Sequence, residues 1–292
     1  MGIPNLCRDH KVERFSDEFW KILKKYARVM ANGRQNTFWF IYSDFFSFDD
    51  EGNIKKFDKE SLKKYIQTFL DEGLYAIQGA PFLRRRNWVE DAMLVSIPSK
   101  NEIPAISEKG KKLVTEMLTD VIAFLKENGW ENRWLQSVFD EPTEKYVERY
   151  KEMIGLVKSL KPDIRILEAT MTMDVAGLVN YWCPQVQEYQ HNRSFFDERK
   201  KAGDKVWVYT CLAPGGPWIN RLVDQERLRP VYIGWARAKY DLHGYLHWGF
   251  NKNRGNPFTE LVRFHTDSNT YLPAGDSHIV YALGDELLSS QR

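Results

Sequence analysis

The chain has 292 residues, with 42 Lys and Arg against 40 Asp and Glu, a formal net charge of +2, and 43% apolar and 14% aromatic residues. This composition indicates a globular protein with a large core, and it excludes a disordered chain and a fibrous repeat. A nearly neutral chain has no overall field to hold a polyanion, and the arginine run at residues 84 to 86 is too short to make one. We therefore expect no nucleic-acid partner.

The sequence indicates a soluble chain without a cofactor. No stretch approaches the roughly 20 consecutive apolar residues of a membrane span, and the first 15 residues lack the apolar core of a signal peptide. Cys7, Cys183 and Cys211 are widely spaced and form no CxxC pair, which argues against a disulfide scaffold and a zinc site. We expect neither metal nor cofactor, and the sequence leaves the cellular compartment and the oligomeric state open.

Helices and strands are predicted to alternate from the first helix onward. Apolar residues at helical spacing predict a helix that begins after Ser16, as its N-cap, and ends at Gly33. The segment at 46 to 53 has the Asp and Gly chemistry of a loop, and the segment from about 80 to 105 is irregular. Further helices are expected at 58–72, 107–128, 142–160, 195–202 and 226–240, and strands at 37–42, 74–79, 92–97, 133–139, 163–171, 177–182, 205–212 and 243–250.

Seven or eight strands that alternate with helices, without a linker or a shift in composition, predict an α/β fold of a particular kind. The pattern favours one (β/α)8 TIM barrel over residues 1 to 292 rather than two domains. A doubly wound sheet is the competing architecture, but it usually places a glycine-rich phosphate turn after its first strand, and the sequence after residue 40 has none.

Reactive groups of a (β/α)8 barrel lie where its strands end, which directs attention to Asp140 and Glu141. These two carboxyl groups follow the predicted strand at 133–139 and precede Pro142. Neighbouring residues of a regular strand face opposite sides, so both carboxyls reach one cleft only if the strand breaks there. We expect Pro142 to hold Glu141 extended and to begin the next helix. The competing interpretation of the local sequence is that one of the acids caps this helix.

Aromatic and amide side chains follow several other predicted strands. Tyr189, Tyr209, Trp248 and Asn251 are candidates for ring stacking and hydrogen bonding to a sugar, although each one singly is more often part of the core. An excess of aromatic residues, with 10 Trp and 14 Tyr, points in the same direction. His243 and His247 stand four apart, but in a strand this spacing separates them too widely for a zinc pair. No nucleotide loop and no GxSxG motif is present.

The motifs together resemble a known enzyme family. Phe-Asp-Glu-Pro at 139–142, LVNYWCP at 178–184, VWVYTCLAPGGPWIN at 206–220, GWARAKYDLHGYLHWGFN at 234–251 and GDSHIVY at 275–281 are similar to the catalytic domain of glycoside hydrolase family 123. The same motifs mark its uncharacterised relatives, the domain of unknown function 4091 group. The resemblance extends over nearly the whole chain from about residue 15.

The resemblance implies a (β/α)8 barrel with β-N-acetylgalactosaminidase activity that retains the anomeric configuration through the 2-acetamido group of the substrate. Carried onto this sequence, Glu141 is the general acid and base, and Asp140 orients the acetamido N–H and stabilises its developing charge. Tyr189 and Tyr209 are candidates to bind the acetamido carbonyl. Trp248 and Trp207 are candidates for the sugar platform, with Asn251 on a hydroxyl.

Two alternatives stay open at this stage. The first is a glycosidase of the same fold with another sugar specificity. The second is a barrel without catalytic activity that binds a glycan, in which Asp140 and Glu141 only cap a helix. In all three cases the expected partner is a carbohydrate or a glycoconjugate.

Overall fold

The computed structural model describes residues 1–265 and 269–290. The chain forms two compact units whose segments interleave along the sequence. The first unit consists of Met1–Gln35, Asp71–Leu74 and Cys183–Arg292, and the second of Asn36–Leu70 and Tyr75–Trp182. We describe each unit by itself.

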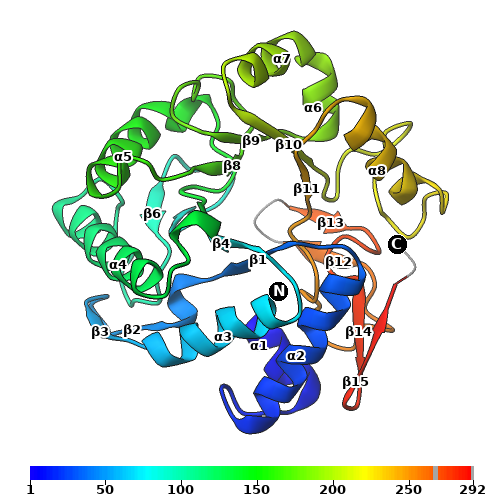
Figure 1. Ribbon diagram of the computed structural model, residues 1–292, viewed down its shortest axis with the longest axis horizontal. Helices are drawn as coiled ribbons and strands as arrows, with labels where there is room; N and C mark the ends of the chain where they lie inside the picture. The colour runs from blue at the N-terminus through cyan, green and yellow to red at the C-terminus, as the bar shows by residue number, and fades with distance from the viewer. Residues whose placement is uncertain (266–268, 291–292) are drawn as a thin grey trace. The chain divides into compact units, whose positions relative to one another are not determined.

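The second unit is built around short parallel strands. Strands β1 (Thr37–Phe40), β4 (Ala76–Gly79) and β7 (Trp134–Gln136) form a parallel sheet in the order β1-β4-β7. A parallel bridge between Gln136 and Ile166 continues towards β8 (Leu167–Ala169). Helices α3 (Lys59–Asp71), α4 (Glu108–Glu127) and α5 (Val147–Leu160) connect these strands and lie along one side of them (Figure 1). This is the strand and helix alternation that the sequence predicts.

Helix α4 shows why these helices form where they do. Its N-cap Ser107 accepts a hydrogen bond from the backbone N–H of Gly110 at 3.1 Å, and Asn128 is its C-cap. One face buries apolar side chains, in part against α5. Each large apolar side chain that is buried in this way stabilises the fold by about 1.5 to 3 kcal/mol. The predicted helix after Ser107 is therefore confirmed. The predicted helices at 16–33, 58–72, 195–202 and 226–240 are likewise present.

Two segments of the second unit differ from the predictions. Residues 46–53, expected as a loop, begin an antiparallel hairpin of β2 (Phe46–Phe48) and β3 (Ile54–Phe57), with the Asp49 carboxylate accepting from the N–H of Asn53 in its turn. The irregular segment contains a second hairpin, in which β5 (Leu83–Arg85) pairs antiparallel with β6 (Met93–Val95). The predicted strand at 92–97 is thus present as β6, but it lies outside the parallel series.

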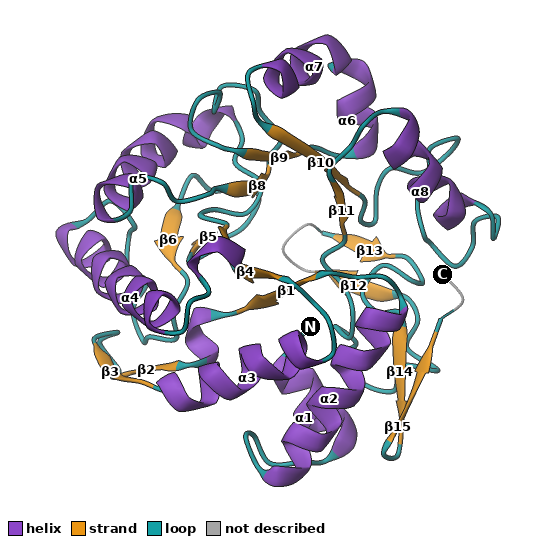
Figure 2. Ribbon diagram, viewed as in Figure 1, coloured by secondary structure: helices purple, strands orange, loops and turns teal. Residues whose placement is uncertain are grey.

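The first unit joins the two ends of the described chain. Its parallel strands β10 (Lys205–Tyr209) and β11 (Gly244–Leu246) pair directly. Strand β9 (Tyr181–Cys183) contains the point in the sequence where the second unit ends and the last segment of the first unit begins. The helices are α1 (Ile3–His10), α2 (Asp17–Asn32), α6 (Val186–His191), α7 (Arg193–Lys201) and α8 (Arg229–Lys239). Two antiparallel hairpins follow, β12 (Arg263–His265) with β13 (Thr270–Leu272), and β14 (Val280–Leu283) with β15 (Glu286–Ser289); Figure 2 shows both as paired strands.

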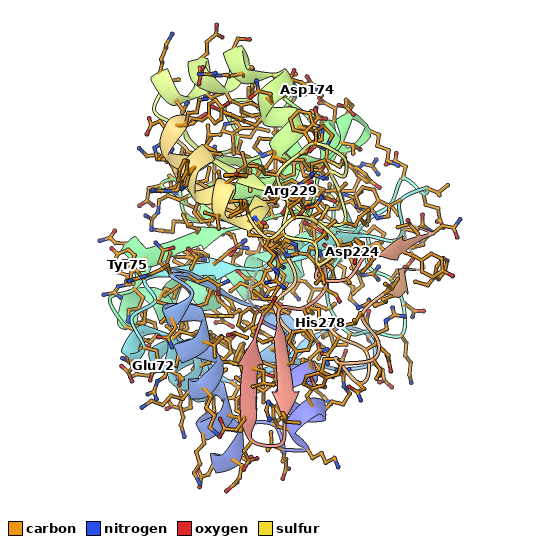
Figure 3. All side chains as sticks on the ribbon, turned by 90° about the vertical axis from the view of Figure 1, so that its right-hand side faces the viewer. Glu72, Tyr75, Asp174, Asp224, Arg229 and His278 are labelled. Atoms are coloured by element: carbon orange, nitrogen blue, oxygen red, sulfur yellow. The ribbon has the colours of Figure 1, made fainter. Side chains whose placement is uncertain are left out.

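Helix α2 illustrates how the first unit is held. Ser16 accepts a hydrogen bond from the N–H of Phe19 at 3.2 Å, so the predicted N-cap is confirmed. The exposed end of α2 carries Arg28, whose Nε donates to Glu72 at 3.0 Å; Figure 3 labels this glutamate.

The chain has a mixed α/β fold. The closed (β/α)8 barrel and the single domain over residues 1 to 292 stay predictions.

Candidate active site

Asp140 and Glu141, the acidic pair, lie at a break after strand β7. Ladder pairing of β7 ends at Gln136, and a single parallel bridge then joins Phe139 to Leu83 of β5. Asp140 and Glu141 form a bend directly after that bridge. The expected strand break is therefore present, but Glu141 is not extended. Its φ of 51° lies in the left-handed region, which is strained for a residue with a Cβ, so the predicted effect of Pro142 on Glu141 is wrong.

Neither acid occupies the N-cap of a helix. The next turn is the short 3-10 helix η3 (Glu144–Tyr146), whose N-cap is Thr143, and α5 then begins at Val147 with Tyr146 as its N-cap. The prediction that Pro142 begins the helix is wrong for the same reason. Because a helix dipole acts mainly within its first turn, α5 has little influence on the ionisation of the pair. The capping interpretation of Asp140 and Glu141 is thus not what the structure shows.

Arg85 of strand β5 holds the backbone of this bend. Its Nη2 donates hydrogen bonds to the carbonyl oxygens of both Asp140 and Glu141, each at 2.5 Å. The guanidinium carbon lies 3.7 Å from the ring centroid of Trp88 and 5.5 Å from that of Phe139. A planar, always charged group with several donors suits such a place, because it can bind two carbonyls while its faces stack on rings.

Glu168 of strand β8 holds the same segment from its N–H side. This residue is 1% exposed, and its carboxylate accepts hydrogen bonds from the backbone N–H of Val138 at 3.0 Å and from the Tyr150 hydroxyl at 2.8 Å. A weaker bond of 3.4 Å comes from the N–H of Phe139. The carboxylate thus replaces the ladder partner that these two amides lack. Burial raises the pKa of Glu168 well above its ordinary value, and the charge of Asp140 adds to the increase.

Two opposing effects act on the Asp140 carboxyl. Desolvation by the surrounding protein raises its pKa, the positive charge of Arg85 lowers it, and the net change is an increase. The residue is nevertheless exposed to solvent, whereas Glu141 is half-buried. Water therefore screens both effects at Asp140.

A layer of buried polar groups lies beneath the acidic pair. The Gln136 side chain, 0% exposed, accepts a hydrogen bond from the Tyr42 hydroxyl at 2.8 Å and donates to the carbonyl of Ala80 at 3.2 Å. Its oxygen would stand 2.0 Å from a Cβ at position 79, which explains why glycine occupies that end of β4. Gln78 donates to Ser137 at 3.0 Å. Because these groups satisfy one another, the strand ends can be polar and still buried.

Three of the predicted sugar contacts lie on or beside two paired strands of the first unit. Trp207 and Tyr209 are two residues apart on β10 and therefore share a face, and Trp248 follows the adjacent strand β11. The Trp207 indole covers the backbone of Gly244, where a Cβ would come within 2.5 Å of the ring. Tyr209 is 3% exposed, whereas Trp207 and Trp248 are half-buried.

A buried charged cluster supports Trp248. The indole Nε1 donates to the Asp276 carboxylate at 3.0 Å, and Asp276 is 0% exposed. Burial raises the pKa of Asp276 to about 6. Arg221 lies close by, in contact with the His247 ring and with the carbonyl of Gly249 at 2.7 Å, and burial together with this arginine holds the pKa of His247 well below its ordinary range.

The other two predicted sugar contacts have structural partners. Tyr189 does not follow a strand but lies in helix α6, where it is 3% exposed and packs between Phe196 and Tyr240, with its hydroxyl 3.5 Å from the carbonyl of Tyr240. The Asn251 amide, 1% exposed, accepts from the N–H of Gly2 at 2.7 Å and donates to its carbonyl at 3.1 Å. These contacts favour a packing role for Tyr189 and a tethering role for Asn251.

Sequence reasoning missed Arg85, Glu168 and the cluster around Asp276. Glu168 carried a usable signal, since a carboxylate inside an apolar strand must find hydrogen-bond partners when it is buried. Arg85 carried none, because its strand was not predicted. Within residues 1–265 and 269–290, no group of three or more His, Cys, Asp or Glu is placed to hold a metal ion, and no helix is long and apolar enough to cross a bilayer.

Comparisons with known proteins show the family to which the chain belongs. The sequence model described as glycoside hydrolase 123, catalytic domain, matches residues 3–292. Among solved structures, the chain is similar to a family 123 glycoside hydrolase from Clostridium perfringens, described in work on glycolipid glycan hydrolysis, with a TM-score of 0.78 and 17% identity over 100% of this chain and 55% of that one. The chain thus spans about half the length of that relative.

More distant similarities include two other glycosidases. A rutinosidase from Aspergillus niger has a TM-score of 0.51 and 13% identity, covering 94% of this chain and 82% of that one. A β-D-glucuronidase from Dictyoglomus thermophilum has a TM-score of 0.51 and 12% identity, covering 92% and 46%. At such identities the likeness is one of fold. No curated protein matches the sequence significantly. The match of its family model over residues 3–292 shows that the chain belongs to glycoside hydrolase family 123, through the catalytic domain of that family.

Proposed function

We propose that the chain is a retaining exo-glycosidase of the β-N-acetylgalactosaminidase type, with the 2-acetamido group of the substrate as nucleophile. Membership of family 123 supports a glycosidase. The observation that carries the proposal is the pair Asp140 and Glu141, held in a strained turn at a strand end and used by no helix as a cap. The Clostridium perfringens relative is described in connection with glycolipid glycans, which supports a glycoconjugate as substrate.

In the first step the acetamido carbonyl oxygen attacks the anomeric carbon while the glycosidic C–O bond breaks. Glu141, protonated, gives its proton to the departing oxygen. Asp140, ionised, accepts a hydrogen bond from the acetamido N–H and stabilises the positive charge that develops on the forming oxazolinium ring. No enzyme carboxylate becomes bonded to the sugar, so the two acids need not stand on opposite sides of the ring as they do in two-carboxylate glycosidases.

In the second step water opens the ring. The Glu141 carboxylate takes a proton from the water as its oxygen bonds to the anomeric carbon, and the carbonyl of the acetamido group is restored. Two displacements at one carbon return the original anomeric configuration. Glu141 ends the cycle protonated and ready for the next substrate.

We propose Trp248 as the main ring-stacking residue, with Trp207 beside it. Trp207 lies on strand β10, Trp248 follows the adjacent parallel strand β11, and both indoles are half-buried. The hydrogen bond to Asp276 fixes the orientation of Trp248. Indole faces suit the apolar C–H face of a sugar. Tyr209 remains the better candidate for the acetamido carbonyl. The contacts of Tyr189 and Asn251 described above make both weaker candidates.

A panel of nitrophenyl glycosides tests the proposal. We expect hydrolysis of the galacto substrate with a 2-acetamido group, slower hydrolysis of its gluco epimer, and none when a hydroxyl replaces the acetamido group. A thiazoline derived from N-acetylgalactosamine, which mimics the cyclised intermediate, should inhibit strongly. Hydrolysis of 2-hydroxy glycosides without thiazoline inhibition would instead support a glycosidase of another specificity, and glycan binding without turnover a non-catalytic barrel.

Substitution of Glu141 separates the acid role from binding. In Glu141→Gln, hydrolysis of a substrate with a poor leaving group should fall by at least about 100-fold, because general acid catalysis contributes roughly that much. Hydrolysis of an activated nitrophenyl substrate should fall far less in its first step, since this leaving group needs no proton. Equal losses of kcat/KM on the two substrates would refute the acid role. Asp140→Asn is the matched comparison and should impair both substrates.

A further inference from the structure

Strand alternation separates the three neighbouring arginines at 84 to 86. Arg84 and Arg86 both pair with Glu102, at 3.6 Å and 2.5 Å, and Arg86 also contacts Glu90. Arg85 points the other way, as period-two geometry requires, and its guanidinium lies at the backbone of the acidic pair. Only one of the three charges is therefore placed to act on Asp140 and Glu141.

The two sides of this contact come from distant parts of the sequence. Leu83 N–H donates to the carbonyl of Val138 at 3.1 Å, and the parallel bridge from Leu83 to Phe139 places β5 directly beside the segment that carries the acids. Arg85 is thereby brought to carbonyls that lie 55 and 56 residues away along the chain. Stacking on Trp88 and Phe139 limits the movement of the guanidinium.

The left-handed turn at Glu141 needs such an external support. A residue with a Cβ adopts this conformation at a cost, and it persists only where the surroundings determine it. The carbonyls of Glu141 and Asp140 both accept hydrogen bonds from one nitrogen of Arg85. Glu168 binds the backbone amides of Val138 and Phe139, the two residues before Asp140. The backbone just before and within the turn is therefore bound at both its donors and its acceptors.

We propose that Arg85 is a positioning residue of the acidic pair, whose guanidinium holds the left-handed turn and so determines where the Asp140 and Glu141 carboxyl groups are presented. The inference rests on the catalytic role proposed for that pair. Arg85 itself has no bond to make or break in the reaction. Its second effect is electrostatic: the positive charge of Arg85 from β5 favours the ionisation of Asp140, which burial opposes. Glu168 from β8 also lies near this carboxyl, and the charge of Asp140 raises the pKa of Glu168.

Arg85→Gln is the direct test. A misplacement of about 1 Å at a catalytic group can reduce the rate about 100-fold, so we expect kcat to fall by about that factor while KM changes less than about threefold. The acid limb of the pH profile should move to higher pH, because Asp140 must be ionised and loses the charge that lowers its pKa. Arg85→Lys, which keeps the charge without the planar fork, should leave the acid limb in place and lose about tenfold in kcat.

Arg84→Gln is the matched control, because Arg84 is the neighbour of Arg85 and carries the same charge. Its side chain pairs with Glu102. It should retain the kcat and the pH profile of the wild type. Arg85→Gln behaving like Arg84→Gln would overturn the proposal. If Arg85→Gln does not fold, as thermal denaturation would show, the same comparison is made with Arg85→Lys, and an undiminished kcat there overturns the proposal equally.

A crystal structure of Arg85→Gln, with carboxyl NMR titration of Asp140, tests the positioning role of Arg85 without relying on activity. We expect φ of residue 141 to leave the left-handed region and the pKa of Asp140 to rise. An unchanged turn with an unchanged titration would refute the positioning role even if Asp140→Asn and Glu141→Gln are inactive. Conversely, a wild-type protein that hydrolyses no glycoside contradicts the proposed function, while the structure and titration still test Arg85.

Discussion

Among single residues, Glu141 combines the function proposed for it with an unfavourable backbone conformation. Its φ of 51° is close to that of Lys11, 53°, but the two residues differ in setting. Lys11 is the exposed C-cap of helix α1, where a left-handed residue is usual. Glu141 stands between a strand and a proline, where the hydrogen bond from Arg85 to its carbonyl supports the same conformation. Strain of this kind is commonly found at functional sites.

Glu141→Gly should therefore stabilise the protein while abolishing hydrolysis of substrates with poor leaving groups. The left-handed region destabilises a folded residue with a Cβ by roughly 1 to 2 kcal/mol, and glycine avoids this strain. Glycine also lowers the stability by about 0.5 to 1 kcal/mol, because it makes the unfolded chain more flexible. We expect a net gain of about 0.5 to 1 kcal/mol in the free energy of unfolding, measured by urea denaturation. Lys11→Gly is the control and should gain similarly without loss of activity. A less stable Glu141→Gly variant would contradict the strain argument.

At the scale of elements, a side chain replaces backbone hydrogen bonds between the segment that follows strand β7 and strand β8. The backbone amides of Val138 and Phe139 bind the Glu168 carboxylate, which also receives the Tyr150 hydroxyl from helix α5. One buried carboxyl thus connects two strands and a helix beneath the acidic pair. Such a network is stable only while each member keeps its partner, so its ionisation matters for the whole element.

Stability should depend on pH through Glu168. Burial raises its pKa in the folded state above the value of about 4.3 in an unfolded chain, so the folded state binds this proton more tightly. The contribution of Glu168 to stability is then complete below the ordinary pKa and is lost as the pH rises through the raised one. Glu168→Gln, which carries no charge, should remove this decline from urea denaturation curves recorded between pH 4 and pH 8.

The exposed Glu148 of helix α5 provides the comparison for this measurement. Its side chain is 86% exposed and pairs with Lys151. Glu148→Gln should therefore keep the pH dependence of the wild type. If the wild type grows more stable over this pH range, or if Glu168→Gln follows the same curve as the wild type, the buried carboxyl is not the group responsible.

At the scale of the whole molecule, the first unit is assembled from the two ends of the chain. Gly2 binds Asn251, the Asn5 amide binds the carbonyl of Asn253 at 2.5 Å, and the His10 ring lies 2.7 Å from the carbonyl of Gly284. These contacts join segments more than 240 residues apart. Helix α1 is therefore part of the unit that contains β10 and β11, although nothing in its own sequence indicates this.

Asn251→Ala tests the tethering role of this amide. Its removal leaves the buried N–H and carbonyl of Gly2 without their partner, which should lower the free energy of unfolding by about 2 kcal/mol. KM for the preferred glycoside should remain near its wild-type value. Thr259→Ala, at an exposed position of the same unit, should leave both quantities unchanged. Unaltered stability with a raised KM would instead return Asn251 to the sugar-binding residues.

The sequence alone determined those features whose causes are local. Helical spacing with a serine N-cap placed the helices after Ser16 and Ser107, since both signals lie within a few residues of the helix start. The same holds for the acidic pair, because two carboxyls after an apolar run are visible without any partner. The joint pattern of five motifs was sufficient for the family, which the comparison confirmed.

Tertiary structure alone decided how the pair is held and which aromatic and amide candidates have other partners. The contacts of Arg85 and Glu168 with the acidic segment span 55 and 30 residues, and that of Asn251 with Gly2 spans 249. No local pattern encodes such contacts, because they arise only when strands pair and distant segments pack together. The backbone of Glu141 is the plainest example: a proline after it predicts an extended residue, and a guanidinium from another strand supports a left-handed one.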